Sequence, residues 1–413
     1  MYKNSLTILI LFVTSLLFAQ NDVEVLTPTN IKSVVLHGQK ANNFEPIIRL
    51  GETLFFSFDD LDGDEKEYTY KLTHCTANWE VSDISSTDYS DGFTEDTIRD
   101  YENSFNTYQN YTHYELKLPN QNMRIKISGN YLISVLDEDG ETVFTRRFMV
   151  YQQKVDVGVS IHKARKIADI TSKQNVELVI NYPNLRINNP SEEIQVSLYQ
   201  NNDWNNVITH LKPQYFRGTQ LLYKYGDETT FFGGNEFLYF DTKDYRTATN
   251  NIRRVELKDI YETRLYVDES RLNKSYTYNP DINGNYLIRT VNTENPKVEA
   301  DYTKVHFIYK TNKENKNANF YVYGAFNNWE FNEENKLKHT TQDYYETDIL
   351  LKQGFYNYNY VSLNENNAID NTIEGTHFQT ENNYTVLVYF KEFGSKYDQI
   401  IGYGVGNSLN LQN

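Results

Sequence analysis

Short runs of β-branched and aromatic residues recur along the chain at spacings typical of β-strands. In the first third of the chain these runs lie at 34–36, 53–58, 68–72, 114–118, 131–136 and 144–150. Asp139-Gly140 lies between two runs and favours a hairpin, because the turn needs a positive φ that glycine tolerates. Several strands at this spacing predict an antiparallel β-sandwich.

The pattern continues to the C-terminus and predicts an all-β chain of three tandem β-sandwich domains. Runs at 177–182, 195–199, 236–240, 264–267 and 286–289 form a second group, and runs at 304–309, 320–323, 345–350, 355–361 and 384–390 a third. A chain of 413 residues exceeds the roughly 250 to 300 residues of one core. The polar segments 152–157 and 290–301 are predicted boundaries. We therefore expect domains at 21–152, 153–295 and 296–413.

Residues 1–20 predict a cleaved signal peptide. A basic start at Lys3 precedes an apolar run from Leu6 to Phe18 and a small residue, Ala19. This run is shorter than the roughly 20 apolar residues of a spanning helix. We expect cleavage near Ala19 or Gln20 and a soluble mature protein outside the cytoplasm; a retained N-terminal anchor is the alternative.

Composition narrows the function classes. One cysteine, Cys75, allows no intramolecular disulfide, so each domain depends on core packing, which 35 Tyr and 23 Phe can supply. The net charge of −16 and a pI near 5 argue against nucleic acid as a partner and against docking on an anionic membrane leaflet. We expect neither nucleic-acid binding nor direct membrane insertion.

The acidic string Asp59-Asp60-Leu61-Asp62-Gly63-Asp64-Glu65 is a candidate calcium loop. An EF-hand loop needs glycine at its sixth position, but counting from Asp60 that position is Glu65. We therefore predict a solvated hairpin tip, with a weak cation site as the alternative.

No motif for catalysis, metal or cofactor binding is apparent. The histidines show no zinc spacing, and His74 and Cys75, being adjacent on a strand, point to opposite faces. Cys75 is therefore predicted to be a buried small hydrophobic residue. We expect no enzyme activity, no catalytic residue, no metal site, no cofactor and no small-molecule ligand, although a pair of hydrolytic carboxylates from distant strands stays open.

Two glycine-containing strings suggest ligand sites. Gly233-Gly234 could form a ligand loop, but a tight turn before the strand 236–240 is favoured.

The string Gly324-Ala325-Phe326-Asn327-Asn328-Trp329, with the later strand 354–360, resembles the glycogen-binding modules of the early-set immunoglobulin-like fold. In those modules the tryptophan stacks on a sugar, supported by a lysine and a second tryptophan. Here Asn359 replaces the lysine and 362–366 holds no tryptophan. The resemblance implies that the predicted β-sandwich domains are immunoglobulin-like or early-set. We expect Trp329 to be a core or interface residue, and glycan binding by Trp329 is the weaker alternative.

A set of short sequence motifs, spread over the whole mature chain, resembles those of another family. They are 58–61, 68–70, His74-Cys75-Thr76-Ala77-Asn78-Trp79 and 91–93 in the first domain, 233–241 and 281–286 in the second, and 324–329 in the third. Their order and spacing resemble the plug protein of the bacterial type IX secretion system.

The resemblance implies a periplasmic protein, peripherally associated with an outer-membrane complex. Its partner would be the giant SprA-type outer-membrane translocon barrel, whose pore it blocks at the periplasmic end when no substrate is passing. Aromatic anchors with polar rims suit such a protein interface. A periplasmic glycan-binding module protein and an unrecognised hydrolase are the alternatives. The sequence assigns no partner-binding residue.

Overall fold

The structure is a computed structural model that describes residues 24–39, 44–246, 249–291, 293–311, 318–341, 343–364, 369–370 and 372–411. The predicted signal peptide, 1–20, lies outside the described residues. Within them the chain is built almost entirely of β-strands, with three one-turn α-helices and two short 3₁₀ helices. The all-β sandwich prediction is confirmed. No helix among the described residues is long and apolar enough to cross a membrane.

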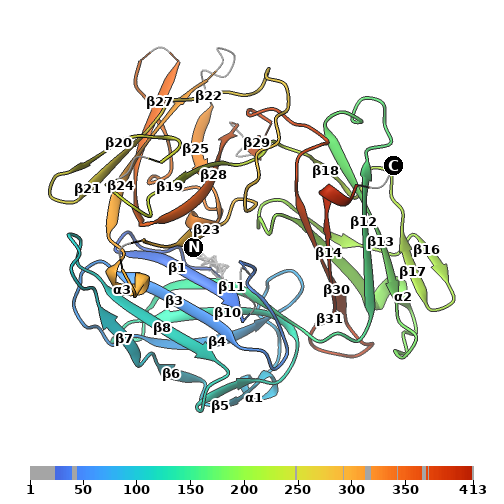
Figure 1. Ribbon diagram of the computed structural model, residues 1–413. Coiled ribbons are helices and arrows are strands. Elements are labelled where there is room, and N and C mark those ends of the chain that lie inside the picture. The colour runs from blue at the N-terminus through green and yellow to red at the C-terminus, as the bar shows by residue number, and fades with distance from the viewer. Residues whose placement is uncertain are drawn as a thin grey trace, which may run out of the picture.

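Lobe 1, residues 31–151, is a sandwich of two sheets, drawn in blue to teal in Figure 1. One sheet has the order β1 (Ile31–Gly38), β3 (Leu54–Asp60), β8 (Thr112–Leu118), β7 (Asp100–Asn103). The other has the order β2 (Ile47–Arg49), β11 (Thr142–Tyr151), β10 (Gly129–Leu136), β4 (Thr69–Cys75), β6 (Glu95–Thr97), while β5 (Ser90–Gly92), which follows α1 (Ser86–Tyr89), pairs with β9 (Met123–Ile125). The predicted Asp139-Gly140 hairpin joins β10 to β11, with φ +79° at Gly140.

Lobe 2 is formed by two distant parts of the chain, residues 156–232 and 383–407. Its first sheet has the order β12 (Asp156–Lys163), β13 (Lys173–Asn181), β17 (Gln220–Tyr223), β16 (Tyr215–Arg217), and β18 (Thr230–Phe232) also pairs with β13. Its second sheet has the order β15 (Val207–Leu211), β14 (Ile194–Gln200), β30 (Asn383–Phe390), β31 (Gln399–Asn407). The short helix α2 (Pro190–Glu193) directly precedes β14, and the short helix η2 (Ser408–Asn410) directly follows β31. Figure 1 shows green and red ribbons side by side in this lobe.

Lobe 3, residues 238–370, lies in the chain between the two parts of lobe 2. One sheet has the order β19 (Leu238–Asp241), β28 (Gly354–Leu363), β23 (Tyr286–Ile288), with β25 (Asn319–Tyr323) and β29 (Ile369–Asp370) also paired to β28. The other has the order β20 (Ile252–Leu257), β21 (Tyr261–Leu265), β24 (Tyr302–Lys310), β27 (Tyr344–Lys352), β26 (Lys338–His339), with β22 (Asp268–Glu269) paired to β24. The helices α3 (Pro296–Glu299) and η1 (Ala325–Asn327) lie in its connections.

The sequence predicts a boundary between domains 153–295 and 296–413, but strands from the two sides of this boundary pair in the same sheets. Strands β19 to β23, expected in the second domain, lie in the sheets of lobe 3, whereas β30 and β31, expected in the third, extend the sheet of β14. Lobe 3 is therefore inserted into lobe 2. The physical reason is strand pairing: Ile194–Gln200 pairs along its full length with Tyr384–Phe390, about 190 residues later, and sequence pattern carries no information on that partner.

Close contact between β31 and β12 closes lobe 2 on one side. A Cβ added to Gly404 would lie 2.6 Å from a methyl carbon of Val157, and one added to Gly406 would lie 2.7 Å from Ile161. Any larger side chain at these positions would push the two strands apart. Glycines at alternate positions of β31 thus allow β12 to pack directly against it.

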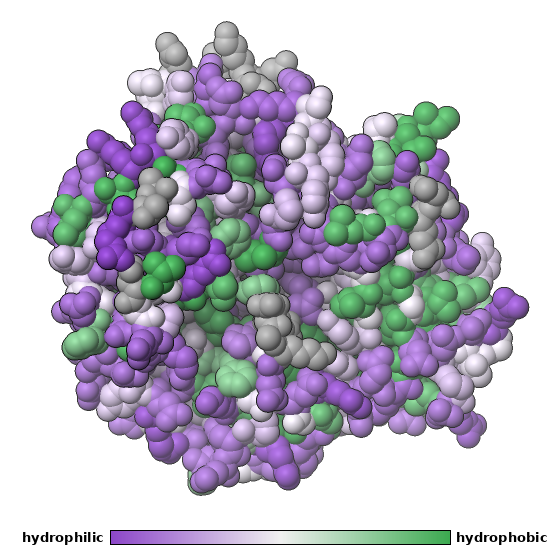
Figure 2. All heavy atoms as spheres, in the orientation of Figure 1, coloured by the Kyte–Doolittle hydropathy of each residue, from purple (hydrophilic) through white to green (hydrophobic). Residues whose placement is uncertain are grey.

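Each lobe has its own core, rich in aromatic side chains. Fully buried tyrosines occur in all three, among them Tyr131 in lobe 1, Tyr384 in lobe 2 and Tyr358 in lobe 3. On the face shown in Figure 2, hydrophilic residues cover most of the surface, and hydrophobic residues show in small groups, several of them along the central seam between the lobes. The sandwiches are thus held by core packing, and Cys75 is a free thiol.

Candidate functional site: the junctions between the lobes

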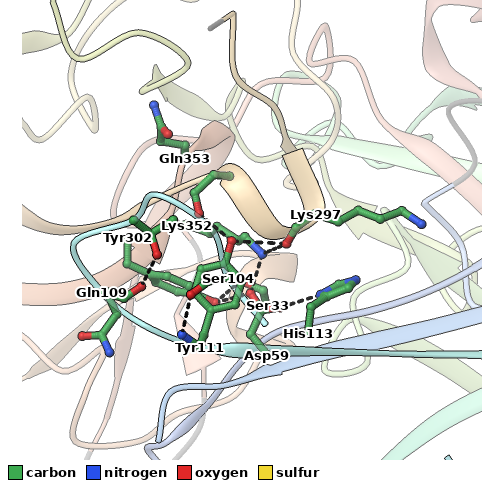
Figure 3. Close-up of polar contacts among 12 residues, drawn as sticks. Ser33, Asp59, Ser104, Gln109, Tyr111, His113, Lys297, Tyr302, Lys352 and Gln353 are labelled. Atoms are coloured by element: carbon green, nitrogen blue, oxygen red, sulfur yellow. Dashed lines mark hydrogen bonds and ion pairs between the residues drawn. The ribbon is translucent and has the colours of Figure 1, made fainter. Parts of the chain in front are cut away.

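An ion pair between lobes 1 and 3 is fully buried. Asp59, at the end of β3, accepts a hydrogen bond of 2.7 Å from the Nζ of Lys352, at the end of β27 (Figure 3). Both side chains are at most 1% exposed. The two residues are 293 positions apart, so the pair links the lobes directly.

Neighbouring groups satisfy the remaining polar atoms of this pair. Tyr302 of β24 donates its hydroxyl to the same Asp59 oxygen at 2.6 Å, and Lys352 also donates to the carbonyl of Lys297 at 2.5 Å. The ring of Tyr111 lies 4.1 Å from the Lys352 ammonium, close enough for a cation–π contact. Such a buried pair is stable only when its other hydrogen bonds are made, as they are here.

His113 of β8 completes the cluster from the lobe 1 side. Its Nδ1 lies 2.6 Å from the second oxygen of Asp59, as expected from the pairing of Asp59 with His113 across β3 and β8. Burial acts to raise the pKa of Asp59, but Lys352 and His113 outweigh burial and lower it. Asp59 is therefore held as a carboxylate between the Lys352 ammonium and the His113 imidazole.

The second junction, between lobes 2 and 3, brings together residues of the 233–241 and 281–286 strings. Glu236, from the 233–241 string, accepts hydrogen bonds from the hydroxyl of Tyr276 and from the backbone N–H of Glu381. Asp281, from the 281–286 string, accepts from the backbone N–H groups of Phe237 at 2.6 Å and Asn283 at 2.7 Å. Two of the strings therefore fold into one contact.

The third string, residues 324–329, contacts the 281–286 string at Gly284. The N–H of Ala325 donates to the carbonyl of Gly284 at 2.8 Å. A Cβ on Gly284 would lie 2.3 Å from the ring of Trp329 and 2.8 Å from that of Phe237, and Gly284 has φ +78°. Only glycine fits both the backbone conformation and the available space.

Because Trp204 of lobe 2 packs on its cluster and Asn205 of lobe 2 donates to its carbonyl, Trp329 is an interface residue. It is 4% exposed and packs against Phe237 and Tyr323, with ring centroids 6.2 and 5.1 Å away. A ring buried in this way offers no free face on which a sugar could stack. The alternative use of Trp329 as a glycan-binding residue thus finds no support in its position.

Each lobe contributes one of the three tryptophans of the chain to the central seam. Trp79 of lobe 1 meets Trp204 of lobe 2 edge-on, with centroids 5.6 Å apart, and Trp204 also packs on the cluster that contains Trp329. The guanidinium of Arg147 lies 4.9 Å from Trp79 and 5.8 Å from Trp204, and it pairs with Glu24 at 2.7 Å. Aromatic packing therefore joins all three lobes.

Polar contacts secure lobe 1 to lobe 2 beside these tryptophans. The hydroxyl of Tyr403 donates to Glu45 at 2.6 Å, and Asn202 donates to the other oxygen of Glu45 at 3.0 Å. The backbone N–H of Ala77 donates to Asp398 at 3.0 Å. Interfaces within a chain leave the domains free to move unless they are large and well packed. The junctions here favour one rigid body.

Asp203 joins lobe 2 to lobe 3 through a group that titrates near neutral pH. The hydroxyl of Tyr323 donates to Asp203 at 2.7 Å, and the amide of Asn205 donates to the carbonyl of Trp329 at 2.6 Å. Burial raises the pKa of Asp203 to about 7, partly offset by the Tyr323 hydrogen bond. Burial likewise raises the pKa of Asp281 to about 7 and that of Asp268 to about 6.

Stability should therefore fall as the pH rises toward 8. Because these carboxyls have folded-state pKa values above their usual value of 3.8, their contribution is fully present below about pH 4 and is lost as the pH rises through 6 to 7. We expect the urea midpoint of Asp203→Asn to vary less between pH 5 and pH 8 than that of the wild type. An equal variation in both proteins would contradict this assignment. His74, whose pKa burial lowers to about 4, acts in the opposite sense in both proteins and does not affect the comparison.

The acidic string is only partly the solvated hairpin tip that the sequence predicts. Asp59 and Asp60 are fully buried, whereas Asp62 and Asp64 are exposed. Oxygens of Asp60, Asp62 and Asp64 lie within 4.8 Å of one another, close enough to hold a cation. The ammonium of Lys66 is in contact with all three, at 2.9 Å from Asp60 and 3.6 Å from Asp64. The Lys66 ammonium thus occupies the place between these carboxylates and offsets part of their charge.

Two other predictions on single residues can be compared with the structure. Cys75 is buried, as predicted, and burial raises the pKa of its thiol to about 12, so it is a weak nucleophile. Gly233-Gly234 forms no tight turn, although Gly234 has φ +64°; the segment passes residue 377, where a Cβ added to Gly233 would be 2.0 Å from the carbonyl oxygen of His377.

Sequence reasoning missed the cluster of Asp59, Lys352 and Tyr302. Asp59 was included in the acidic string, but no local signal marks Lys352 as its partner, because charged residues at strand ends are normally exposed. The polar face of β3 near its end was the only available hint.

The comparisons with known proteins agree with the sequence resemblance. A family model, type 9 secretion system plug protein 1st domain, matches residues 31–152, which include lobe 1. A search of curated proteins finds no match. Among solved structures, the chain is similar to a hypothetical protein from Parabacteroides merdae ATCC 43184, with 30% identity and a TM-score of 0.89, covering 93% of this chain and 98% of that one.

Two weaker structural matches carry no argument, because their TM-scores are too low. One is trypsin-activated alpha-2-macroglobulin from Escherichia coli, with 10% identity and a TM-score of 0.18, covering 93% of this chain and 24% of that one. The other is a mixed-linkage glucan utilization locus protein, SGBP-B, from Bacteroides ovatus, with 12% identity and a TM-score of 0.12, covering 78% and 73%. On the family match and the full-length structural relative, the chain belongs to the family of type 9 secretion system plug proteins and has a role in type 9 secretion.

Proposed function

We propose that the protein is a non-catalytic periplasmic plug of the type IX secretion system. It binds the giant SprA-type outer-membrane translocon barrel and blocks the periplasmic end of its pore when the barrel is idle. It reaches the periplasm by means of its signal peptide, and it stays attached to the complex through protein contacts.

The observation that carries this proposal is the way in which the three lobes are joined. A wide aqueous pore can be sealed only by a body that does not deform or open under passing solutes. The buried Asp59–Lys352 pair joins lobe 1 to lobe 3, the Trp79–Trp204 contact joins lobe 1 to lobe 2, and the Tyr323–Asp203 hydrogen bond joins lobe 3 to lobe 2. Few lobe rearrangements are compatible with contacts that are desolvated to this extent.

Envelope leakage tests the proposal. Cells that lack the gene should admit antibiotics too large for ordinary porins, and expression of the wild-type chain should restore the barrier. The control is a strain that lacks both this gene and the translocon barrel, in which the leakage should disappear because the open pore is gone. Leakage that persists without the barrel, or its absence in the single deletion, would contradict the plug role.

A further inference from the structure

The hairpin of β16 and β17 lies at the outer edge of lobe 2 and presents large side chains to solvent. Tyr215 and Phe216 of β16 are 55% and 52% exposed, and Arg217 is exposed beside them. β16 is the last strand in its sheet, with β17 on one side only. In Figure 1 these strands lie at the right-hand periphery, away from the other two lobes.

The chain segment that contains this hairpin is basic, although the protein as a whole is acidic. Residues 204–226 contain no Asp or Glu and carry Lys212, Arg217 and Lys224, in a chain of net charge −16. Lys224 lies 3.7 Å from Glu177. Within the described part of the chain, Lys212 and Arg217 have no carboxylate within ion-pair distance. The edge therefore has positive charge available for a partner.

Two other sheet edges, β7 and β20, carry charged side chains instead. The edge strand β7 carries the exposed acids Asp100 and Glu102, and β20 carries Arg253 and Arg254 together with Glu256. Charged side chains on an edge strand discourage the addition of a further strand. Exposed aromatic residues at β16 favour a contact instead, since Tyr, Phe and Arg are enriched at protein interfaces.

We propose that the β16 edge binds an acidic, extended segment of the translocon by strand addition. The backbone of the segment would pair with β16, while its acidic side chains would meet Lys212 and Arg217. Tyr215 and Arg217 share one face of the strand and Phe216 occupies the other, so both faces would contact the added strand. The identity of the partner rests on the proposed function. An anionic membrane would satisfy the charge but offers no backbone to pair with β16.

Two charge-reversal variants of the full mature chain test the proposal. Lys212→Glu with Arg217→Glu alters the β16 edge, and Arg253→Glu with Arg254→Glu makes the same change in net charge on the β20 edge. Each protein is immobilised and incubated with detergent-solubilised envelope, and the recovered translocon barrel is quantified by mass spectrometry. We expect the first variant to lose at least tenfold of the recovered barrel and the second to match the wild type. The affected residues are exposed, so both variants should keep the wild-type melting temperature.

The outcomes separate this proposal from the plug role. Recovery of no barrel by the wild type would overturn the plug role and, with it, this partner. Equal recovery by the wild type and both variants, or equal loss in both variants, would overturn the β16 site alone. Binding of the wild type to phosphatidylglycerol vesicles, lost in the first variant while barrel recovery is unchanged, would assign the edge to a membrane and overturn strand addition.

Hydrogen exchange gives a readout that charge alone would not move. In the complex, the backbone amide of Phe216 should exchange at least tenfold more slowly than in the free protein, because the added strand covers it. Amides of β20 should exchange at the same rate in both states. Unchanged exchange at 215–217 in a complex that still contains the barrel would overturn strand addition.

Discussion

Asp59→Ala should destabilise the protein by about 3–5 kcal/mol, because it leaves the Lys352 ammonium buried without a carboxylate. The loss falls on the contact between lobes 1 and 3, so we expect these lobes to separate before the individual sandwiches unfold. Urea unfolding followed by far-UV circular dichroism and by tryptophan fluorescence would detect this, since all three tryptophans lie at or near the seam.

A second ion pair between the same lobes provides a matched control. Lys32 and Glu334 lie 2.6 Å apart, but Glu334 is 41% exposed. Glu334→Ala should therefore cost at most about 1 kcal/mol. Replacing both buried partners, as Asp59→Leu with Lys352→Met, should restore much of the stability, because no unpaired charge remains. Equal losses for Asp59→Ala and Glu334→Ala would contradict the buried pair as the main lobe 1–3 contact.

Gly284→Ala should destabilise lobe 3, beside its contact with lobe 2, by about 2–4 kcal/mol. The positive φ costs alanine about 1 kcal/mol, and the added methyl would overlap the rings of Trp329 and Phe237, for which overpacking adds about 1–3 kcal/mol. Relaxation of the overlap would move Trp329, so its fluorescence should shift to the red as the ring becomes exposed. Thermal unfolding measured by fluorescence and by calorimetry would give both quantities.

Gly140→Ala is the control that separates the cost of a positive φ from the cost of close packing. Gly140 has nearly the same φ, +79°, in the β10–β11 hairpin, but an added Cβ would meet nothing within 4 Å. This variant should lose only about 1 kcal/mol and leave the tryptophan spectrum unchanged. If both glycine variants lost the same amount, close packing at Gly284 would play no part.

Local features of the fold could be predicted from the sequence. The Asp139-Gly140 hairpin, the alternation in 53–58 and the aromatic composition led to the all-β prediction, because turns and strand faces are determined by neighbouring residues. The burial of Cys75 followed from its place in a strand with adjacent residues on opposite faces. These inferences need no knowledge of which strands pair.

Long-range pairing could not be predicted, and the candidate site depends on it. The insertion of lobe 3 into lobe 2 depends on the pairing of β14 with β30. Other strands have a similar composition, so the sequence does not indicate this partner. Asp59 was expected in solvent, since an acidic string is normally exposed, and only the arrival of Lys352 and Tyr302 explains its burial. Trp329 was assigned to core or interface, but its neighbours in another lobe were not identifiable.

Conductance of the purified translocon barrel in a planar bilayer tests the central claim most directly. The barrel, freed of this protein, is reconstituted in one orientation, and the purified mature chain is added to the periplasmic side. The plug account predicts that the conductance falls to near the level of the bare membrane, and that addition to the opposite side has no effect. A conductance that stays unchanged at saturating protein would contradict it.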